Sequence, residues 1–318
     1  MSNCTSNLPY VVSGDCHGLL SGWAKTRGLR IPPAQFFSDL GQERCETISR
    51  LFHFQCVYLD EEELSGGVLR LISNSAVPVI ALDHCYTGGS GISLQVSRLC
   101  DPETLQSAAH IGSRISEPVQ SQLDRVSSEI ASVEAQLVDD VIYSGKDLAN
   151  QIIPSLSKRG VKVVRIVAGV VIGDGRSKIH EYYPEIDIMA VRDFPKVHDE
   201  ICERDFLAGV PQSGRLLGKN GLPIYPKTGV PYFHPFAIDW TTGTSLMSDW
   251  AGMNCEENPD EIRDFSIFCL RQSIGLWLKV EALSGRLVHC DELERRPRGV
   301  PNDHTRFIDH LEDIREKL

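Results

Sequence analysis

The sequence predicts an α/β fold in which helices cover a parallel β-sheet. Apolar runs rich in β-branched residues recur at 77–83, 135–142, 162–172 and 186–192. Polar segments of helical length separate most of these runs, and this alternation is typical of βαβ units with right-handed crossovers. Continuous apolar runs indicate strands that are buried on both faces of a sheet. With 318 residues, 42% of them hydrophobic, the chain can bury a core of that kind.

The composition narrows the class of protein. Lys and Arg number 32 against 43 Asp and Glu, so the net charge is −11. A charge of that sign argues against nucleic acid as a partner, although it permits a local anion pocket built from backbone N–H groups. The ten cysteines form no C-x-x-C pair, and no apolar run is long enough to span a membrane. Because residues 1–14 also lack a signal-peptide pattern, we expect a soluble, cytoplasmic protein without membrane association.

The patterns divide the chain into three parts. These are an N-terminal extension (1–75) packed on the core, an α/β core (76–204) and a loop-rich C-terminal part with helices (205–318). Within the extension, 44–64 predicts a helix that runs into a strand, and 65–75 predicts a short helix or strand followed by a turn.

The core part continues after its first strand with a glycine-rich loop at 84–91 and a strand at 92–99. The polar stretch 102–132 is compatible with a helix. After the next strand, apolar residues at helical spacing over 146–160 predict a helix that ends at Gly160.

The C-terminal part has a different composition. Glycine, proline and aromatic residues are frequent over 209–243, which predicts loops and short strands laid over the core. Residues 258–283 predict a long helix with Pro259 at its first position and Gly285 as a stop. A final helix is expected over 304–317.

The most informative segment runs from Ala135 to Leu148. It is an apolar strand that ends in Asp139 and Asp140, followed by a tight turn with Gly145 and then a helix. Backbone N–H groups of such a turn and of a helix N-terminus point at a phosphate, and ligands of open α/β sheets bind at that edge. The paired acids can hold ribose hydroxyls, or a metal through water. An ordinary βαβ turn with paired acids is the alternative.

This segment resembles the phosphoribosyl pyrophosphate (PRPP) motif of type I phosphoribosyltransferases. In that motif an apolar strand, two acids and two apolar residues precede a Ser/Thr-Gly phosphate loop. The matching positions are Asp139, Asp140, Val141, Ile142, Ser144 and Gly145. Lys146 is compatible with the pattern, because some purine-salvage members carry Lys there. Asp147 departs from it, since the family usually has Thr at this position and a carboxylate would repel the 5′-phosphate.

The resemblance implies a type I phosphoribosyltransferase-like parallel sheet flanked by helices, with the N- and C-terminal additions forming a hood. It implies transfer of ribose 5-phosphate from PRPP to a nitrogen nucleophile of a planar acceptor, with release of pyrophosphate and with Mg²⁺ as cofactor. Asp139 and Asp140 would be the catalytic residues, and would hold the ribose hydroxyls or Mg²⁺ through water. The 5′-phosphate would be bound by backbone N–H groups of Tyr143, Ser144, Gly145, Lys146 and Asp147, with the Ser144 hydroxyl and Lys146, and Val141 would be a further substrate-binding residue. Homodimers are common in the family, so a homodimer is a further expectation.

The family also has a pyrophosphate loop after an earlier strand, and the loop at 84–91 stands at that place. Its candidate residues are His84, Thr87, Gly88, Gly89 and Gly91. Family members usually carry Lys or Arg there, and a glycine-rich hairpin turn is the alternative. A mobile catalytic loop usually follows, in an interval that holds Arg98, Arg114 and Arg125. These arginines could neutralise pyrophosphate, and solvated surface arginines are the alternative.

The acceptor would lie after the fourth core strand. Phe206 could stack on a nucleobase, Asp205 could accept a base N–H, and the turn at Arg215 could hold an anion. An ordinary loop with Arg215 in a salt bridge is the alternative. A group of aromatic residues could roof a planar ligand or form a satellite core under a long loop. Its members are Tyr225, Tyr232, Phe233, His234, Phe236 and Trp240.

The sequence also allows functions other than transfer of ribose 5-phosphate to be considered. Residues 13–18 (SGDCHG) resemble the first metal motif of calcineurin-like phosphoesterases, but the chain lacks the G-D-x-x-D and G-N-H segments which that family needs. A non-catalytic ligand-sensing or regulatory protein with the same fold is a second hypothesis, favoured by Asp147 and by the missing basic loop residue. An enzyme for a different phosphosugar is a third. Release of pyrophosphate would separate the two enzymes from the regulator.

Overall fold

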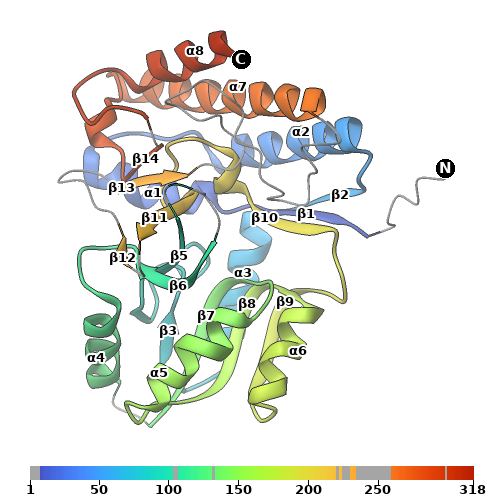
Figure 1. The fold of residues 1–318 in the computed structure, drawn as a ribbon, viewed down its shortest axis with the longest axis vertical. Coiled ribbons are helices and arrows are strands. Elements are labelled where there is room, and N and C mark those ends of the chain that lie inside the picture. The colour runs from blue at the N-terminus through green and yellow to red at the C-terminus, as the bar shows by residue number, and fades with distance from the viewer. Residues whose placement is uncertain are drawn as a thin grey trace.

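The computed structural model describes most of the chain (Figure 1). The described residues are 8–101, 103, 107–130, 133–219, 222–223, 230–233, 259–297 and 299–318. The structure describes only the backbone at 98, 107–110, 219, 222–223, 230–233 and 259. Within the described ranges, no helix is both long enough and apolar enough to cross a membrane.

A five-stranded parallel sheet forms the lower half of the molecule in Figure 1. Its order is β4 (Ile92–Ser93), β3 (Val79–Ala81), β7 (Glu134–Ile142), β8 (Lys162–Ile172) and β9 (Asp187–Phe194), and all neighbours are parallel. The chain leaves β3 towards one edge of the sheet and leaves β7 towards the other. The strand order therefore reverses between β3 and β7, and this is the place where open α/β sheets bind ligands.

Helices cover both faces of this sheet, as the continuous apolar strands require. One face carries α4 (Val119–Glu129), a π-helical turn (Leu148–Ile152) that leads into α5 (Ile153–Ser157), and α6 (Gly173–Tyr182). The opposite face carries α3 (Glu61–Ser73), whose Leu64, Val68 and Ile72 pack with Val138, Val167 and Val170. Successive residues of β8 alternate between the two hydrophobic clusters, so the sheet is the middle of three layers.

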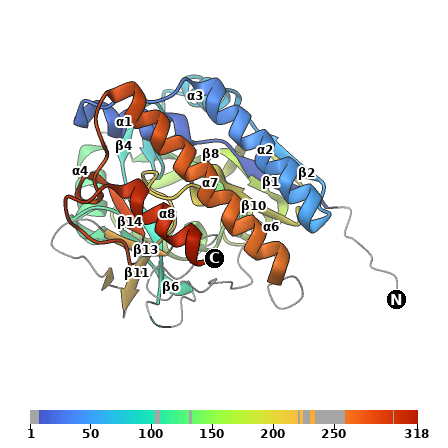
Figure 2. The ribbon, with the colours of Figure 1, turned by 90° about the horizontal axis from the view of Figure 1, so that it is seen from above.

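The two ends of the chain form the other half of the molecule together (Figure 2). A three-stranded parallel sheet has β1 (Tyr10–Ser13) between β10 (Asp199–Cys202) and β2 (Cys56–Leu59). The helices on this side are α1 (Cys16–Arg27), α2 (Ala34–Phe52), α7 (Pro259–Ser284) and α8 (Phe307–Lys317). Trp23 of α1 meets Trp277 of α7 edge-on, and Trp277 meets Phe307 of α8 in the same way. The N-terminal and C-terminal parts thus share one core.

A third sheet bridges these halves. Its order is β14 (Arg295–Pro297), β13 (Val230–Phe233), β11 (Arg215–Lys219), β5 (Val96–Cys100) and β6 (Ser107–Ser113), with β12 (Leu222–Pro223) beside β11. Strands β5 and β6 are antiparallel neighbours that follow β4 directly. Short 3₁₀ turns occupy Glu203–Phe206 and Cys290–Glu292.

The parallel sheet and its flanking helices confirm the predicted fold class in its coarse form. The helix that runs into a strand over 44–64 is present as the end of α2 and as β2, but two local predictions were wrong in part. The acidic run after β2 begins α3 rather than ending a strand, because the Asp60 carboxylate accepts the N–H groups of Glu62 and Glu63 as a helix cap. The helical alternative for 65–75 is confirmed, since α3 continues to Ser73. The stretch 102–132 contains strand β6 before α4, and the strand was missed because most residues of β6 (SAAHIGS) are small or polar.

Candidate functional site

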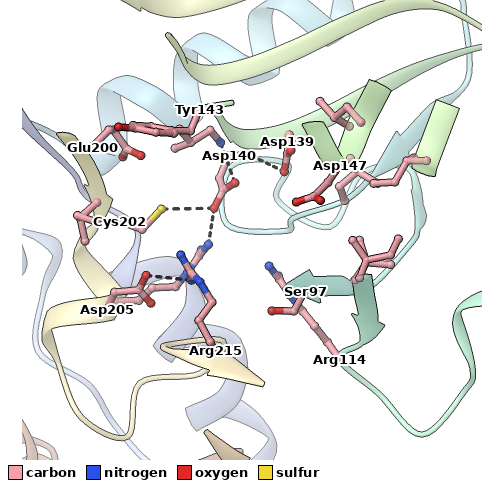
Figure 3. Close-up of a pocket in the computed structure, with 18 of the residues that line it drawn as sticks. Ser97, Arg114, Asp139, Asp140, Tyr143, Asp147, Glu200, Cys202, Asp205 and Arg215 are labelled. Carbon is pink, nitrogen blue, oxygen red and sulfur yellow. Dashed lines mark hydrogen bonds and ion pairs between the residues drawn. The ribbon is translucent and has the colours of Figure 1, made fainter. Parts of the chain in front are cut away.

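A cavity of about 370 Å³ opens at the carboxyl ends of β3 and β7 (Figure 3). Strands β5, β6, β10 and β11 supply its other walls. Its polar lining consists of Ser97, Arg114, Asp139, Asp140, Tyr143, Asp147, Asp199, Glu200, Cys202, Arg204, Asp205 and Arg215. Its volume is within the range of small-molecule sites, and its position at the reversal of strand order is the expected one for a ligand.

The two acids of the predicted motif line this cavity but have different surroundings. Asp140 is nearly buried, and its carboxylate accepts the backbone N–H of Val141 at 2.7 Å and contacts Arg204. Asp139 is half-buried, and its carboxylate accepts the backbone N–H of Asp140 at 3.1 Å. Burial, followed by the negative charges of Asp140 and Asp83, raises the pKa of Asp139 well above its ordinary value. Asp139 is therefore the acid that is placed to exchange a proton or meet a cation.

Asp140 belongs to a buried ion-pair network centred on Arg204. The guanidinium of Arg204 lies 2.9 Å from Asp15, 3.2 Å from Asp83 and in direct contact with Asp140. Arg114 adds a second guanidinium 3.0 Å from Asp83. Burial alone would raise the pKa of Asp83, but Arg204 and Arg114 hold it well below its ordinary value. Burial prevails at Asp15, whose pKa is raised despite Arg204.

The turn after β7 is packed tightly. Gly145 has a φ of +65°, and a Cβ at this position would lie 2.5 Å from the carbonyl oxygen of Gly175 in α6. Gly175 in turn has room for no side chain, since a Cβ there would meet the carbonyl oxygen of Tyr143 at 2.5 Å. A side chain at either position would collide with the backbone opposite, so the turn and α6 can approach this closely only because both residues are glycine.

Beyond this turn, Asp147 lines the cavity and accepts a hydrogen bond from the Gln151 amide at 3.2 Å. Tyr143 and Val141 also line it, whereas Ser144, Gly145 and Lys146 are not among the lining residues. The helix that follows opens with a π-helical turn, a distortion that is frequent at functional sites. An acid thus faces the cavity where the resemblance places the 5′-phosphate.

The opposite wall is also acidic. Glu200 of β10 accepts the Ser13 hydroxyl at 2.6 Å, and burial raises the pKa of Glu200 to about 8. Asp199 is hydrogen-bonded to the Tyr143 hydroxyl, and burial raises its pKa as well. Asp205 accepts the N–H of Gly214 at 2.8 Å and pairs with Arg215 at 3.3 Å. Figure 3 shows Glu200 and Asp205 on the opposite side from Asp139 and Asp147, with the Cys202 thiol in contact with Asp140 between them.

The predicted pyrophosphate loop is not part of the cavity lining. The ring of His84 contacts the Ser93 hydroxyl at 2.6 Å, and Thr87 is fully buried. Gly88 and Gly89 are exposed and have positive φ angles, as expected of a turn. Tyr86 directs its hydroxyl to the carbonyl oxygen of Gly14 at 2.8 Å, which fixes this loop against the N-terminal part of the chain.

The prediction that Phe206 stacks on a nucleobase was wrong. Phe206 is fully buried between Phe265 of α7 and the guanidinium of Arg44, so no ligand reaches its ring. Arg125 pairs with Glu117 and Glu129 near the surface, which is the structural alternative. Arg114 lies at the cavity, and the side chain of Arg98 is outside the description. Of the aromatic group, Tyr225, His234, Phe236 and Trp240 lie outside the described residues, and Tyr232 and Phe233 are described only as part of β13.

Sequence reasoning missed the ionic centre of the site. Asp83 ends an apolar strand in the sequence, which is the signal that could have included it. The sequence pointed to Asp15 only as part of the segment that resembles a phosphoesterase metal motif. In the structure, the Asp15 carboxylate forms an ion pair with Arg204. Arg204 and Glu200 had no signal of their own, because their role depends on β10 pairing with β1.

The donor set was compared with the needs of Mg²⁺, which prefers oxygen ligands and keeps part of its water shell. Asp139, open to the cavity, fits this requirement. Asp140 fits it less well, since Arg204 already contacts its carboxylate. Two clusters of side chains, one with Cys202 and one with Cys85, each bring three potential ligand atoms together. Both clusters include a thiol, and a thiol is a poor ligand for Mg²⁺.

In comparisons with known proteins, no protein-family model and no curated protein matches the chain.

Proposed function

We propose that the cavity binds a phosphosugar, with PRPP as the leading candidate, and transfers ribose 5-phosphate to a nitrogen nucleophile with release of pyrophosphate. The observation that carries this proposal is the position of Asp139. It lies near the carboxyl end of β7, at the reversal of strand order, and lines a cavity of about 370 Å³. The turn with Gly145 and the start of a helix follow the end of this strand, an order that is typical of anion sites.

The chain's own residues divide the work as follows. In its ionised form, Asp139 accepts hydrogen bonds from the ribose hydroxyls, and its negative charge favours the positive charge that develops on the sugar as the C1–O bond breaks. Arg114 and Arg215, both at the cavity, are the cations that face the departing diphosphate. Mg²⁺, when bound to the diphosphate, supplies further charge neutralisation. Six acids against three arginines in the lining make such neutralisation necessary for an anionic substrate.

The acceptor must lose a proton when its nitrogen bonds to C1. Glu200 lines the cavity, is nearly buried and has a pKa of about 8. A carboxylate with a raised pKa is a suitable proton acceptor near neutral pH. We therefore assign the acceptor to the side of the cavity formed by β10, next to Glu200.

The test is isothermal titration of the full chain with PRPP, with and without Mg²⁺, beside ribose 5-phosphate and pyrophosphate. Binding specific to PRPP and dependent on Mg²⁺ is the expected result. The variant Asp139→Asn should lose at least tenfold in affinity without a fall in Tm, because Asp139 has no ion pair to lose in the part of the chain that the structure describes. Unchanged PRPP affinity in Asp139→Asn would refute the role given to this residue.

A regulatory protein that binds the phosphosugar without turnover is the second candidate. Asp147 favours it, since this carboxylate faces the cavity where the donor phosphate would lie. Pyrophosphate release separates the two candidates. With PRPP bound, a screen of nucleobases and related heterocycles should show pyrophosphate for the enzyme, and binding without pyrophosphate for the regulator.

A further inference from the structure

A cysteine pair lies outside the cavity lining, where α2 meets β2, the edge strand opposite β10 in the three-stranded sheet. Cys45 is in the C-terminal half of α2, and Cys56 is the first residue of β2. Their sulfur atoms are 2.7 Å apart, which is closer than two sulfur atoms normally approach without a bond or a hydrogen bond between them. The distance between the thiols thus needs little change for a covalent bond of about 2.05 Å.

Packing holds the two thiols in place. Helix α2 ends at Phe52, and His53, with a φ of +60°, turns the chain back into β2. Cys45 and Cys56 then belong to one hydrophobic cluster with Ile48. The N–H of Cys56 also contacts the Ser49 hydroxyl of the same helix at 3.4 Å. Both backbones are fixed by secondary structure, so the pair is preorganised.

The surroundings favour a disulfide over a metal site. Among the described residues, the groups that could hold a metal do not include Cys45 or Cys56. The nearest buried cation, Arg44, is committed to Glu203 at 3.1 Å. Cys56 is half-buried whereas Cys45 is buried, so a small reagent meets Cys56 first.

We propose that Cys45 and Cys56 form a modification site which closes to an intramolecular disulfide in the presence of a small-molecule disulfide such as oxidised glutathione. Cys56, as thiolate, attacks the oxidant and releases one reduced glutathione. Cys45, as thiolate, then attacks the sulfur of Cys56 and releases the second. The two protons lost by the cysteine thiols are taken up, through solvent, by the two glutathione thiolates that leave, and two electrons pass to glutathione.

The bond would join α2 to β2, the neighbour of β1 in the three-stranded sheet. The disulfide would close residues 45–56 into a covalent ring, which restricts the conformations of the unfolded chain. The oxidised protein should therefore melt a few degrees above the reduced protein. This inference is independent of the proposed function, because neither thiol lines the cavity.

Tryptic mapping of the full chain tests the proposal directly. Arg44, Arg50 and Arg70 flank the two cysteines, so trypsin releases 45–50 and 51–70 as separate peptides. After exposure to oxidised glutathione, alkylation of remaining thiols and digestion, we expect these two peptides joined, and separate again after reduction. Two separately alkylated peptides, stable glutathione adducts or a different cysteine partner would each overturn the proposal.

Matched variants protect the test against simple destabilisation. Cys56→Ser should abolish the difference in Tm between oxidised and reduced samples of the same variant. Cys269→Ser removes a buried thiol of the same cluster and should keep that difference. Loss of the difference in both variants, or its persistence in Cys56→Ser, would contradict the assignment.

Discussion

The carboxyl ends of β3 and β7 lie side by side at the reversal of strand order, yet the acid that follows β3, Asp83, is not part of the cavity lining, whereas Asp139 of β7 is. Asp83, after β3, is buried and held by Arg114 and Arg204. Asp139, at the end of β7, is half-buried and faces the cavity. The aspartate that follows β3 therefore has a structural role, whereas the aspartate of β7 at the same edge of the sheet is available to a ligand.

Remote segments create this difference. The loop after β3 is tied by Tyr86 to Gly14, next to Asp15 in the network of Arg204. The turn after β7 is tied instead to the neighbouring βα unit, through Gly145 and Gly175. Neutralising cations therefore gather at the end of β3, whereas the end of β7 keeps an acid that a ligand can use.

The largest expected effect comes from removing Arg204. Arg204→Met leaves Asp15, Asp83 and Asp140 buried without their shared guanidinium. Breaking a buried pair from one side costs about 3–5 kcal/mol, so the free energy of unfolding should fall by that amount. Chemical denaturation measures it.

Arg165→Met is the matched control, because Arg165 pairs with the exposed Asp187 and an exposed pair contributes less than about 1 kcal/mol. Equal losses in the two variants would show that the end of β3 does not depend on Arg204 for charge balance.

The two turns should respond differently to a methyl group. Gly145→Ala places a Cβ against the carbonyl oxygen of Gly175 at a positive φ, so we expect a loss of about 3 kcal/mol in stability. Gly88→Ala, in the open loop after β3, also has a positive φ but meets no atom within 4 Å, so about 1 kcal/mol is expected. A larger loss for Gly88→Ala than for Gly145→Ala would contradict the tight packing inferred for the turn after β7.

The acidic wall opposite β7 predicts a dependence on pH. The pKa of Glu200 is raised from its ordinary value of 4.5 to about 8 in the folded state, so its stabilising effect is complete below pH 4.5 and is lost as pH rises through about 8. Thermal melts of Glu200→Gln should therefore gain several degrees relative to the parent protein between pH 5 and pH 8. The substituted amide would be neutral throughout and still able to accept the Ser13 hydroxyl.

Glu134→Gln, at the exposed start of β7, is the control for this comparison. A constant difference in Tm between Glu200→Gln and the parent over pH 5–8 would contradict the raised pKa of Glu200.

The sequence predicted those features that depend on residues close to one another along the chain. The apolar runs located β7 and β8 almost to the residue, and the spacing after β7 placed Asp139, Asp140, Tyr143 and Asp147 at one edge. Contacts between distant segments were beyond reach. Arg204 meets Asp15 only because β10 and β1 pair across 189 residues, and Phe206 is buried only because α7 covers it. Periodicity reports which face of an element is apolar, but it does not report which other element covers that face.

Substitution of Asp147 is expected to change stability the least, and it tests most directly which ligand the cavity binds. Its carboxylate lies near a helix N-terminus, where a negative charge contributes about 0.3–1 kcal/mol, so Asp147→Thr should lower stability by no more than that. If a phosphate occupies this turn, the same change removes a like charge and adds a hydroxyl donor. We expect the affinity for PRPP to rise about tenfold, which corresponds to about 1.4 kcal/mol.

Titration calorimetry of Asp147→Thr and Asp147→Asn separates charge from hydrogen bonding, since Asn removes the charge without adding a hydroxyl. Tighter binding in both variants, reduced by added salt, indicates that Asp147 repels the donor phosphate. Weaker binding in both indicates that Asp147 itself holds the ligand, through a hydroxyl or a cation. In that case the end of β7 selects a sugar without a phosphate at this turn, and the resemblance to PRPP-binding enzymes reflects the strand and its acids rather than the substrate.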